Sequence, residues 1–562
     1  MIKFNENPFY LSEEQIKWIN DTYSSMTLEE KIGQLFCPIV FTKDEKELQE
    51  LINKKHIGGM LYREGPGEEI RKAHKILQDT SQIPLLTASN LEYGGNGSAV
   101  EGTYFGREML VSATGDVKKA YQLGKVSCSE GAAVGVNWAF APVVDIDRNY
   151  HNPITNVRTF GDDVDTIIEM SKAYIEAAHE EGVATSVKHF PGDGIDERDQ
   201  HLLTSVNSLS CEEWDNTYGK IYKEMIKAGT LTVMAAQIAM PAYEEYFDGE
   251  ECKRILPATL SKNLLIKLLR ERLGFNGLIT TDATPMVGFC SAMDRETAVP
   301  MSIECGCDMF LFNRNMDEDF VLMKKGYENG ILSDERLEEA VKRILATKAA
   351  LRLPEKKKEG KLVPTEEALK ILNCETYDTW AKECADKGVT LVKDTQNLLP
   401  LDPLKQRRVL LEVMGDFDSN ERVTNSFVKK LEEEGFDVTV YKNEGFEVMH
   451  DSVGSFKFRY DLVMYVGNIE TASNKTVSRL NWHTMFGLGN NMPWMVHELP
   501  VMFISVGNPY HLLDVPMIKT FINGYCNSEY VINAVVEKIM GRSEFKGKSP
   551  IDPFCGKIDT RL

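Results

Sequence analysis

Short apolar runs alternate with longer amphipathic stretches over roughly the first 350 residues of the chain. The runs have the length and composition of buried strands. They are IGGMLY (57–62), IPLLTAS (83–89), VNWAFAPVVD (136–145), VATSVKHF (183–190), LTVMAAQ (231–237), GLITTD (277–282) and CDMFLFN (307–313). Repeated strand–helix alternation predicts an α/β fold with a parallel sheet, most economically a (β/α)8 TIM-like barrel.

Helical patterns fill several of the gaps between these runs. Residues 164–182 and 261–274 carry apolar side chains at helical spacing. Near the start, Thr27 and Glu30 fit a capping box. The helical stripe that follows consists of Leu28, Ile32, Leu35 and Phe36. These patterns predict the helices that cover the barrel.

The composition changes at residues 352–368, a charged, proline-containing stretch that indicates a linker. We expect a helix over 377–394, and after it a more compact strand–helix alternation. The expected strands are RRVLLEVMG (407–415), FDVTVYKN (436–443), DLVMYVGN (461–468), PVMFISVGN (500–508) and KTFINGYC (519–526). This pattern predicts a catalytic barrel over 1–350, a linker and connecting helix over 351–385, and a smaller C-terminal α/β domain with an open sheet over 386–562.

The charge balance narrows the choice of partners. Lysine and arginine number 64 against 85 acidic residues, a net charge of −21, and no basic stripe offsets it locally. Strong acidity disfavours polyanionic partners, so we expect neither nucleic acid nor an anionic membrane surface as a partner.

The remaining composition predicts a reduced, cytoplasmic, soluble protein. The first residues lack the pattern of a signal peptide, and no apolar stretch is long enough to span a membrane. Eleven scattered cysteines argue against a disulfide framework or a structural zinc site. The histidines form no ligand cluster and no phosphate-binding glycine loop is present, so we expect no metal and no organic cofactor.

Polar residues close most of the apolar runs. In a barrel, catalytic residues gather at the carboxyl ends of the strands. The residues at these positions, which can ionise or bind hydroxyl groups, are Asn90, Glu92, Asp145, Lys188, His189, Gln237, Asp282 and Asn313. An ordinary polar loop explains any one of them, but their convergence on one edge predicts a site.

The loop within SVKHFPGDGIDERDQH (186–201) is unusually rich in acids and histidine. Gly192 and Gly194 allow unusual dihedral angles, so we expect a long, mobile loop. Asp199 and His201 are two residues apart, a spacing that points both side chains the same way in an extended segment. The carboxylate can then orient and polarise the imidazole. The pattern indicates a proton-transfer pair; the alternative is an acidic, solvated surface loop.

A second candidate is LITTDATPMVG (278–288), where Asp282 ends an apolar strand and Pro285 and Gly288 follow. A carboxylate at this position can act as a nucleophile or a base. The alternative interpretation is an aspartate that caps the next helix.

These motifs resemble family 3 glycoside hydrolases in their β-N-acetylglucosaminidase branch. KHFPGDGIDERDQH resembles the K-H-F-P-G-H-G-x(n)-D-S-H signature, and TTDATPMVG resembles the nucleophile segment. Similar matches, in order along the chain, are MTLEEKIGQLF, VNWAFAPVVDI with NVRTFGDD, and GVTLVKDTQNLLPL. The resemblance covers nearly the whole chain.

The resemblance implies a retaining exo-β-N-acetylglucosaminidase that removes terminal N-acetylhexosamine from small glycosides such as cell-wall fragments. Asp282 would form a covalent glycosyl-enzyme, and His201, held by Asp199, would be the acid/base. A histidine exchanges protons near neutrality in place of the usual second carboxyl group. The positions matching the family's substrate-binding residues are Asn90, Arg158, Lys188, His189 and Met286.

Three residues depart from the family pattern. Asn90 replaces the usual aspartate, Asp193 stands where the loop signature has histidine, and Gln237 stands where histidine is common. The core roles survive these changes, but the preferred sugar stays open.

Three alternatives therefore stay open. One is a β-glucosidase or β-xylosidase of the same family, which the D-x-H pair disfavours. Another is a β-N-acetylglucosaminide phosphorylase, because a histidine base does not repel phosphate as a carboxylate does. The third is a sugar-binding sensor on a decayed barrel. Oligomeric state is also left open.

The C-terminal domain offers one further candidate, the segment 478–500 with Arg479, Trp482, His483 and Trp494. Such an aromatic loop could stack on a sugar chain. The alternative is ordinary packing against its own domain.

Overall fold

The computed structural model describes residues 2–249, 255–415, 418–442, 452–482, 484–485, 488–489 and 491–562. Contacts divide the chain into two compact units. The first unit comprises residues 1–105, 120–149 and 164–378, and the second comprises 106–119, 150–163 and 379–562. Each unit is described separately below.

The first unit is built on parallel strands. Six of them pair in the order β2-β3-β4-β5-β7-β9, and β1 pairs with β10. Single parallel bridges, Ile39 to Leu61 and Thr280 to Met309, join the two groups into a ring. The strands are β1 (Phe36–Cys37), β2 (Gly59–Leu61), β3 (Leu86–Ser89), β4 (Trp138–Ala139), β5 (Ala184–Phe190), β7 (Thr232–Ala235), β9 (Leu278–Thr281) and β10 (Phe310–Leu311).

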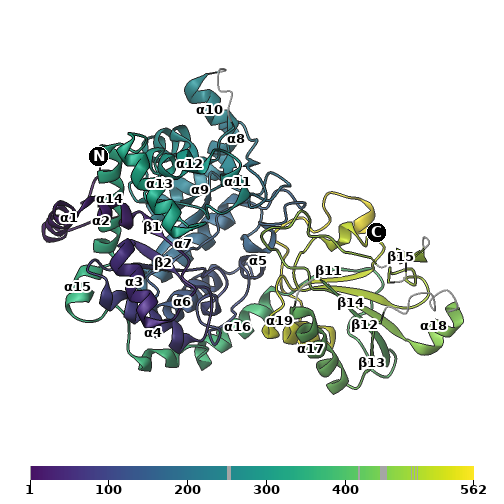
Figure 1. Cartoon of the computed structure of the whole chain (residues 1–562). Helices are drawn as coiled ribbons and strands as arrows, with labels where there is room; N and C mark the ends of the chain where they lie inside the picture. Colours follow the sequence, from purple (N-terminus) through teal and green to yellow (C-terminus); the bar gives the residue numbers. More distant parts are fainter. Residues whose placement is uncertain are drawn as a thin grey trace. The chain divides into compact units, whose positions relative to one another are not determined.

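Helices surround these strands (Figure 1). The longer ones are α1 (Glu13–Ser25), α3 (Glu45–Lys55), α4 (Gly67–Thr80), α6 (Val117–Ala133), α7 (Val164–Glu180), α9 (Tyr218–Lys227), η4 (Asn263–Arg272), α12 (Arg295–Glu304), α13 (Met316–Glu328) and α14 (Asp334–Ala350). The shorter ones are α2 (Leu28–Gln34), η1 (Gly95–Gly97), α8 (Cys211–Asn216), α10 (Pro241–Asp248), η3 (Ala258–Leu260), α11 (Val287–Cys290), α15 (Leu353–Lys358) and η5 (Glu366–Ile371). A two-stranded parallel pair, β6 (Ser205–Val206) with β8 (Ile238–Ala239), lies outside the ring.

The strands are buried along their whole length, as expected for parallel strands covered by helices. All seven residues of β5 are buried. Inside the ring, the indole of Trp138 packs edge-on against Phe140, with 4.7 Å between ring centroids, and donates to the Thr232 hydroxyl at 2.8 Å. The interior is therefore a packed core whose polar groups are hydrogen-bonded where they occur, as Thr232 is.

The second unit carries a six-stranded sheet in the order β11-β18-β17-β14-β12-β13. Strand β11 runs antiparallel to its neighbour, and the other pairs of this sheet are parallel. The strands are β11 (Thr390–Asp394), β12 (Arg408–Met414), β13 (Asp437–Val440), β14 (Leu462–Gly467), β17 (Val501–Ser505) and β18 (Thr520–Asn523). A small hairpin pairs β15 (Thr484–Met485) with β16 (Leu488–Gly489).

Helices α17 (Ser419–Glu433) and α19 (Glu529–Ile539) contact each other beside this sheet (Figure 1). Other helices among the described residues of the unit are α5 (Glu108–Ala113), η2 (Asn156–Arg158), α18 (Val453–Arg459), η7 (His511–Leu513) and η8 (Asp559–Arg561). Most of α16 (Glu375–Gly388) also belongs to it. Its core includes Phe503, which stacks on Phe521 at 5.3 Å.

The α/β class, with a curled parallel sheet followed by a separate C-terminal sheet, confirms the fold predicted from the sequence. The capping box is also confirmed: Thr27 accepts from the Glu30 amide, and the Glu30 side chain accepts from the Thr27 amide. Helices α7 and η4 lie within the two predicted helical ranges.

Two local predictions were wrong. The helix expected over 377–394 ends at Gly388, and Thr390–Asp394 form β11, because a β-branched run follows a helix-ending glycine. Phe36, expected in a helical stripe, begins β1. The expected linker contains α15 and η5, and the division between units falls inside α16. The domain limits given from the sequence stay a prediction.

None of the helices in the described ranges combines the length and apolarity needed to cross a membrane. The ten cysteines among the described residues are free thiols.

Candidate active site

The predicted site residues of the first unit lie at the carboxyl ends of its strands. Asn90 follows β3, Lys188 and His189 belong to the last residues of β5, and Asp282 directly follows β9. Because parallel strands end at one edge, this arrangement gathers them on one side of the sheet.

Lys188 is buried against a carboxylate. Its ammonium group lies 2.7 Å from a carboxylate oxygen of Glu92, and the two side chains are 4% and 8% exposed. An ammonium group has three donors, so two remain for a ligand or for other neighbours. Glu92 therefore fixes the direction of Lys188.

His189 pairs with Asp145, which the sequence had offered only as a polar strand end. Its Nδ1 lies 2.6 Å from Asp145 Oδ2, while the amides of His189 and Asp193 donate to Oδ1 at 3.1 and 2.8 Å. Burial opposes ionisation of Asp145, but the positive charge of His189 and these hydrogen bonds outweigh it and hold the pKa of Asp145 below its ordinary value. The carboxylate orients the ring and leaves Nε2 to face other groups.

Asp199 and His201 form the predicted pair. Nδ1 of His201 lies 2.7 Å from Asp199 Oδ1, and the His201 amide donates to the same oxygen at 2.8 Å. The Asp199 side chain is fully buried and that of His201 is 23% exposed. The buried carboxylate thus fixes the ring, while Nε2 is the nitrogen that can exchange a proton with a ligand.

Gly192 and Gly194 lie where the loop packs closely against its neighbours. Both have positive φ, +122° and +100°. A Cβ on Gly192 would lie 2.2 Å from the Tyr218 ring, and one on Gly194 would lie 1.9 Å from the Ile146 carbonyl. The unusual dihedral angles expected of the two glycines are confirmed, and the glycines also allow close packing; the mobility of the loop stays a prediction.

The Asp282 segment is anchored on both sides. The Asp282 amide donates to the Ala235 carbonyl at 2.6 Å, and the Ala283 amide donates to Asp282 Oδ1 at 2.7 Å. The hydroxyl of Thr284 donates to the Phe312 carbonyl at 2.6 Å. One carboxylate oxygen is thereby oriented, as a nucleophile requires. Met286, the residue before α11, is buried.

An ion pair that the sequence did not reveal supports this segment. Arg295 on α12 binds both carboxylate oxygens of Asp319 at 2.7 Å and donates to the Thr284 hydroxyl at 3.3 Å. Asn313 donates to the same carboxylate at 3.1 Å, which gives this strand-end residue a structural role.

The loop that carries Asp199 and His201 contacts the Asp282 segment directly. The Val287 amide donates to the His201 carbonyl at 2.9 Å, and the Thr204 hydroxyl donates to the Gly288 carbonyl at 2.8 Å. Two candidates far apart in the sequence are therefore joined through their backbones.

The roles of two further residues, Asn90 and Arg158, stay predictions. The half-buried side chain of Asn90 makes no hydrogen bond to the other predicted residues among those that the structure describes. Arg158 lies in η2, within the second unit, where it donates to the Ile154 carbonyl at 3.2 Å. Its role as a substrate-binding residue stays a prediction.

The described residues of the aromatic segment pack against other parts of the second unit. Trp482 packs against the core cluster, Arg479 pairs with Asp514, and Trp494, 46% exposed, lies 5.2 Å from Phe456. These contacts favour ordinary packing. His483 lies outside the described residues.

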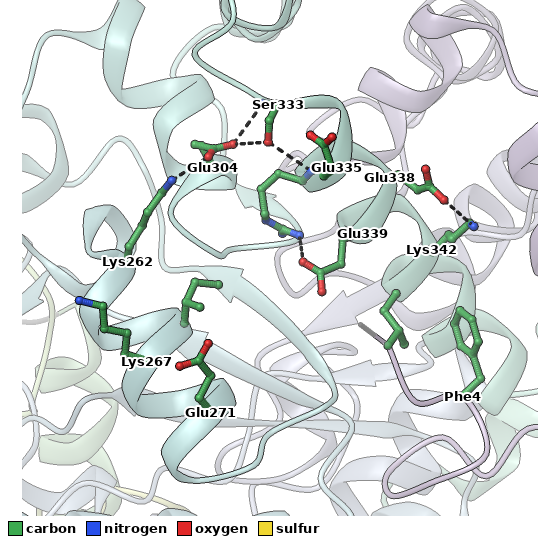
Figure 2. Close-up of a pocket in the computed structure, with 13 residues that line it drawn as sticks. Phe4, Lys262, Lys267, Glu271, Glu304, Ser333, Glu335, Glu338, Glu339 and Lys342 are labelled. Carbon is green, nitrogen blue, oxygen red and sulfur yellow. Dashed lines mark hydrogen bonds and ion pairs between the residues drawn. The ribbon is translucent and has the colours of Figure 1, made fainter. Parts of the chain in front are cut away.

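A separate hollow of about 890 Å³ lies in the first unit among η4, α14 and the N-terminal residues (Figure 2). Figure 2 shows several of its charged side chains in pairs. The pairs are Lys262–Glu304, Lys342–Glu338 and Arg336–Glu339. None of the predicted site residues lines it, so the hollow is distinct from the candidate site.

Within the described ranges, no three histidine, cysteine or carboxylate side chains are grouped as metal ligands.

Sequence reasoning also missed Gln200, whose side chain is fully buried. The available signal was its place between Asp199 and His201.

Comparison with known proteins identifies relatives of both units. The family model described as "Glycosyl hydrolase family 3 N terminal domain" matches residues 27–347. The chain is 42% identical over 570 aligned residues to a protein from Cellulomonas fimi named "Beta-N-acetylglucosaminidase/beta-glucosidase", with 100% of both chains covered.

Solved structures extend the comparison. The chain is 44% identical to a structure named "Beta-glucoside phosphorylase BglX", with a TM-score of 0.94 and 99% of both chains covered. A structure of the same protein bound to 2FGlc gives a TM-score of 0.95. A family 3 β-N-acetylglucosaminidase from Paenibacillus sp. str. FPU-7 shares the fold, with a TM-score of 0.76, 23% identity, and 94% and 99% of the two chains covered.

Proposed function

The chain belongs to glycosyl hydrolase family 3, as its motifs predicted, and we propose that it cleaves terminal β-linked N-acetylglucosamine or glucose from small glycosides with retention of configuration. The observation that carries the proposal is the buried Asp199–His201 pair, whose loop is hydrogen-bonded to the Asp282 segment.

In the first step, the Asp282 carboxylate attacks the anomeric carbon while the bond to the aglycone oxygen breaks. His201 donates its proton from Nε2 to that oxygen, so the aglycone leaves as a neutral alcohol. The products are a glycosyl ester of Asp282 and a neutral imidazole, which Asp199 keeps oriented.

In the second step, an acceptor attacks the anomeric carbon of the glycosyl ester. His201 Nε2 removes the proton from the acceptor oxygen, and the Asp282 carboxylate leaves. The imidazole is protonated again, and the net configuration at the anomeric carbon is retained.

Lys188 and His189 are proposed to hold the sugar. One N–H of Lys188 and Nδ1 of His189 are directed at a buried carboxylate, Glu92 or Asp145, which leaves the other Lys188 N–H groups and His189 Nε2 to meet polar groups of a sugar. Because their partners fix their directions, little side-chain entropy is lost when a sugar binds.

Phosphate is a second candidate acceptor beside water. The acid/base in this proposal is an imidazole, which carries no negative charge when it accepts a proton, so a phosphate anion is not repelled by it. The structural relative at 44% identity is named a β-glucoside phosphorylase, which favours the same possibility.

The test is release of nitrophenol from the p-nitrophenyl β-glycosides of N-acetylglucosamine, glucose and xylose, each with and without phosphate. We expect turnover of the first two. Acceleration by phosphate, with glycosyl phosphate as the product, assigns phosphate as the acceptor, whereas free sugar at an unchanged rate assigns water.

Three variants make this test specific. Asp282→Asn should remove turnover, and His201→Ala should lower it about 100- to 10,000-fold. Glu197→Gln, an exposed carboxylate of the same loop, is the matched control and should retain wild-type turnover. Absence of turnover of every glycoside by the wild type, with the sugar still bound, contradicts the proposal.

A further inference from the structure

Gln200 stands in the sequence between Asp199 and His201, the proposed proton-transfer pair. Its side chain is completely buried. Its Nε2 donates to Asp193 Oδ2 at 3.3 Å. Its Oε1 accepts a hydrogen bond from the backbone amide of Gln237 at 2.9 Å. A single amide side chain thus connects the start of the loop with the end of strand β7.

The residues that meet at Gln200 are two of the departures from the family signature. Asp193 and Gln237 both stand where histidine is usual, and they are far apart in the sequence. The side chain of Gln237 continues the network, since its Oε1 accepts from the Thr259 hydroxyl at 2.6 Å. Asp193 and Gln237, two of the three departures, are therefore connected in this chain through Gln200.

The backbone of Gln200 also faces the Asp282 side of the site. A Cβ on Gly288, in α11, would lie 2.6 Å from the Gln200 carbonyl oxygen. The carbonyl of the next residue, His201, accepts from the Val287 amide at 2.9 Å. A shift of Gln200 would consequently move His201 relative to Asp282, because the loop and α11 are in close contact here.

We propose that Gln200 is a positioning residue that sets the distance between the His201 imidazole and the glycosidic oxygen, an inference that rests on the proposed function. Its amide suits this place because it presents a donor to the Asp193 carboxylate and an acceptor to the Gln237 amide at once. Neither a carboxylate nor an apolar side chain of the same length supplies both groups.

Two variants separate positioning from simple stability. Gln200→Met keeps the length of the side chain and removes both hydrogen bonds. The double variant Gln200→Glu/Asp193→Asn reverses the polarity of one bond. In it, the amide introduced at position 193 donates to the carboxylate introduced at position 200, which still accepts from the Gln237 amide. Thermal unfolding and circular dichroism establish that each variant is folded.

The readout is kcat/KM for two glycosides of the same sugar, one with an alkyl aglycone and one with a dinitrophenyl aglycone. The alkyl alcohol needs a proton to leave and the dinitrophenolate does not. For Gln200→Met we expect a loss of about 10- to 100-fold with the alkyl glycoside and less than about threefold with the dinitrophenyl glycoside. The double variant should recover most of the alkyl activity.

Equal losses with both aglycones would mean that Gln200 merely stabilises the fold, and unchanged rates with both would mean that it does not position His201. Either result overturns the inference while leaving the proposed function intact. Failure of the wild type to cleave either glycoside overturns both.

Discussion

Two buried carboxyl groups, Asp145 in the first unit and Glu412 in the second, differ in whether their surroundings stabilise the ionised form. Both side chains are largely removed from solvent, with 0% and 7% exposure. Asp145 accepts hydrogen bonds from the imidazole of His189 and from two backbone amides. Glu412 on β12 accepts one from the side-chain amide of Asn491 at 2.6 Å.

Their titration differs accordingly. Burial alone would raise both pKa values, but His189 and the backbone hydrogen bonds reverse this effect for Asp145 and hold its pKa below the ordinary value. For Glu412, burial prevails over the Asn491 hydrogen bond and raises the pKa to about 7. The surroundings of Asp145 thus favour its ionised form, whereas those of Glu412 disfavour it.

The largest expected effect comes from removing the stabilised charge with Asp145→Asn. The substitution leaves His189 without its buried carboxylate, so we expect a loss of about 3–5 kcal/mol in the free energy of unfolding. Turnover of a nitrophenyl glycoside should fall about 100-fold as His189 and the loop shift. Calorimetry and rate measurement test this, with Glu197→Gln as control. An unchanged free energy of unfolding would contradict the claim that the surroundings of Asp145 stabilise its ionised form.

The second prediction concerns Glu412→Gln. Because the folded-state pKa of Glu412 is raised from 4.5 to about 7, its stabilising contribution is complete below the unfolded-state value and is lost as pH rises through about 7. Glutamine cannot ionise, so the variant should be more stable than the wild type above pH 7 by about 1–3 kcal/mol, and should match it in mild acid.

Calorimetry across this pH range measures the effect, and Glu421→Gln, an exposed glutamate of the same unit, is the control. A wild-type stability that does not decline between mild acid and neutrality would contradict the assignment of Glu412. For Asp145 the sign is opposite, because a lowered pKa gives stability that is lost as pH falls through the folded-state value.

The smallest effect is expected for Tyr218→Phe. The Tyr218 hydroxyl donates to the Asp193 carbonyl at 2.5 Å, and its ring covers Gly192. Phenylalanine keeps the ring contact and loses a neutral hydrogen bond, so stability should fall by about 1 kcal/mol. Calorimetry again provides the measurement. A loss as large as that of Asp145→Asn would show that the loop depends on neutral contacts as much as on charge.

The sequence predicted most strands because each is a continuous apolar run closed by a polar residue. It missed the two-stranded pairs β6–β8 and β15–β16. Among the strands of the ring and of the six-stranded sheet, it missed β1, which has two residues, and β11, which follows directly on the end of a helix. The two residues of β1 are too few to display a period, and the burial of β11 does not alternate. Each segment pairs with a strand distant in the sequence, β10 or β18.

The site was predicted in part for a similar reason. Asp199 and His201 are close in the sequence, so local geometry was enough to pair them. Gln200 was missed because its partners, Asp193 and the Gln237 amide, meet only after the barrel strands are assembled. Long-range hydrogen bonds of this kind leave no local pattern.

The most direct test of the account is to trap the glycosyl-enzyme. A glycoside with fluorine at C2 and a dinitrophenyl aglycone should react with Asp282 and then break down slowly, because the fluorine destabilises the positively charged transition state of both steps. Mass spectrometry of the digested protein should find the added sugar on the peptide that contains Asp282. A label on another peptide, or turnover of this glycoside with no labelled protein at any time, would contradict the central claim.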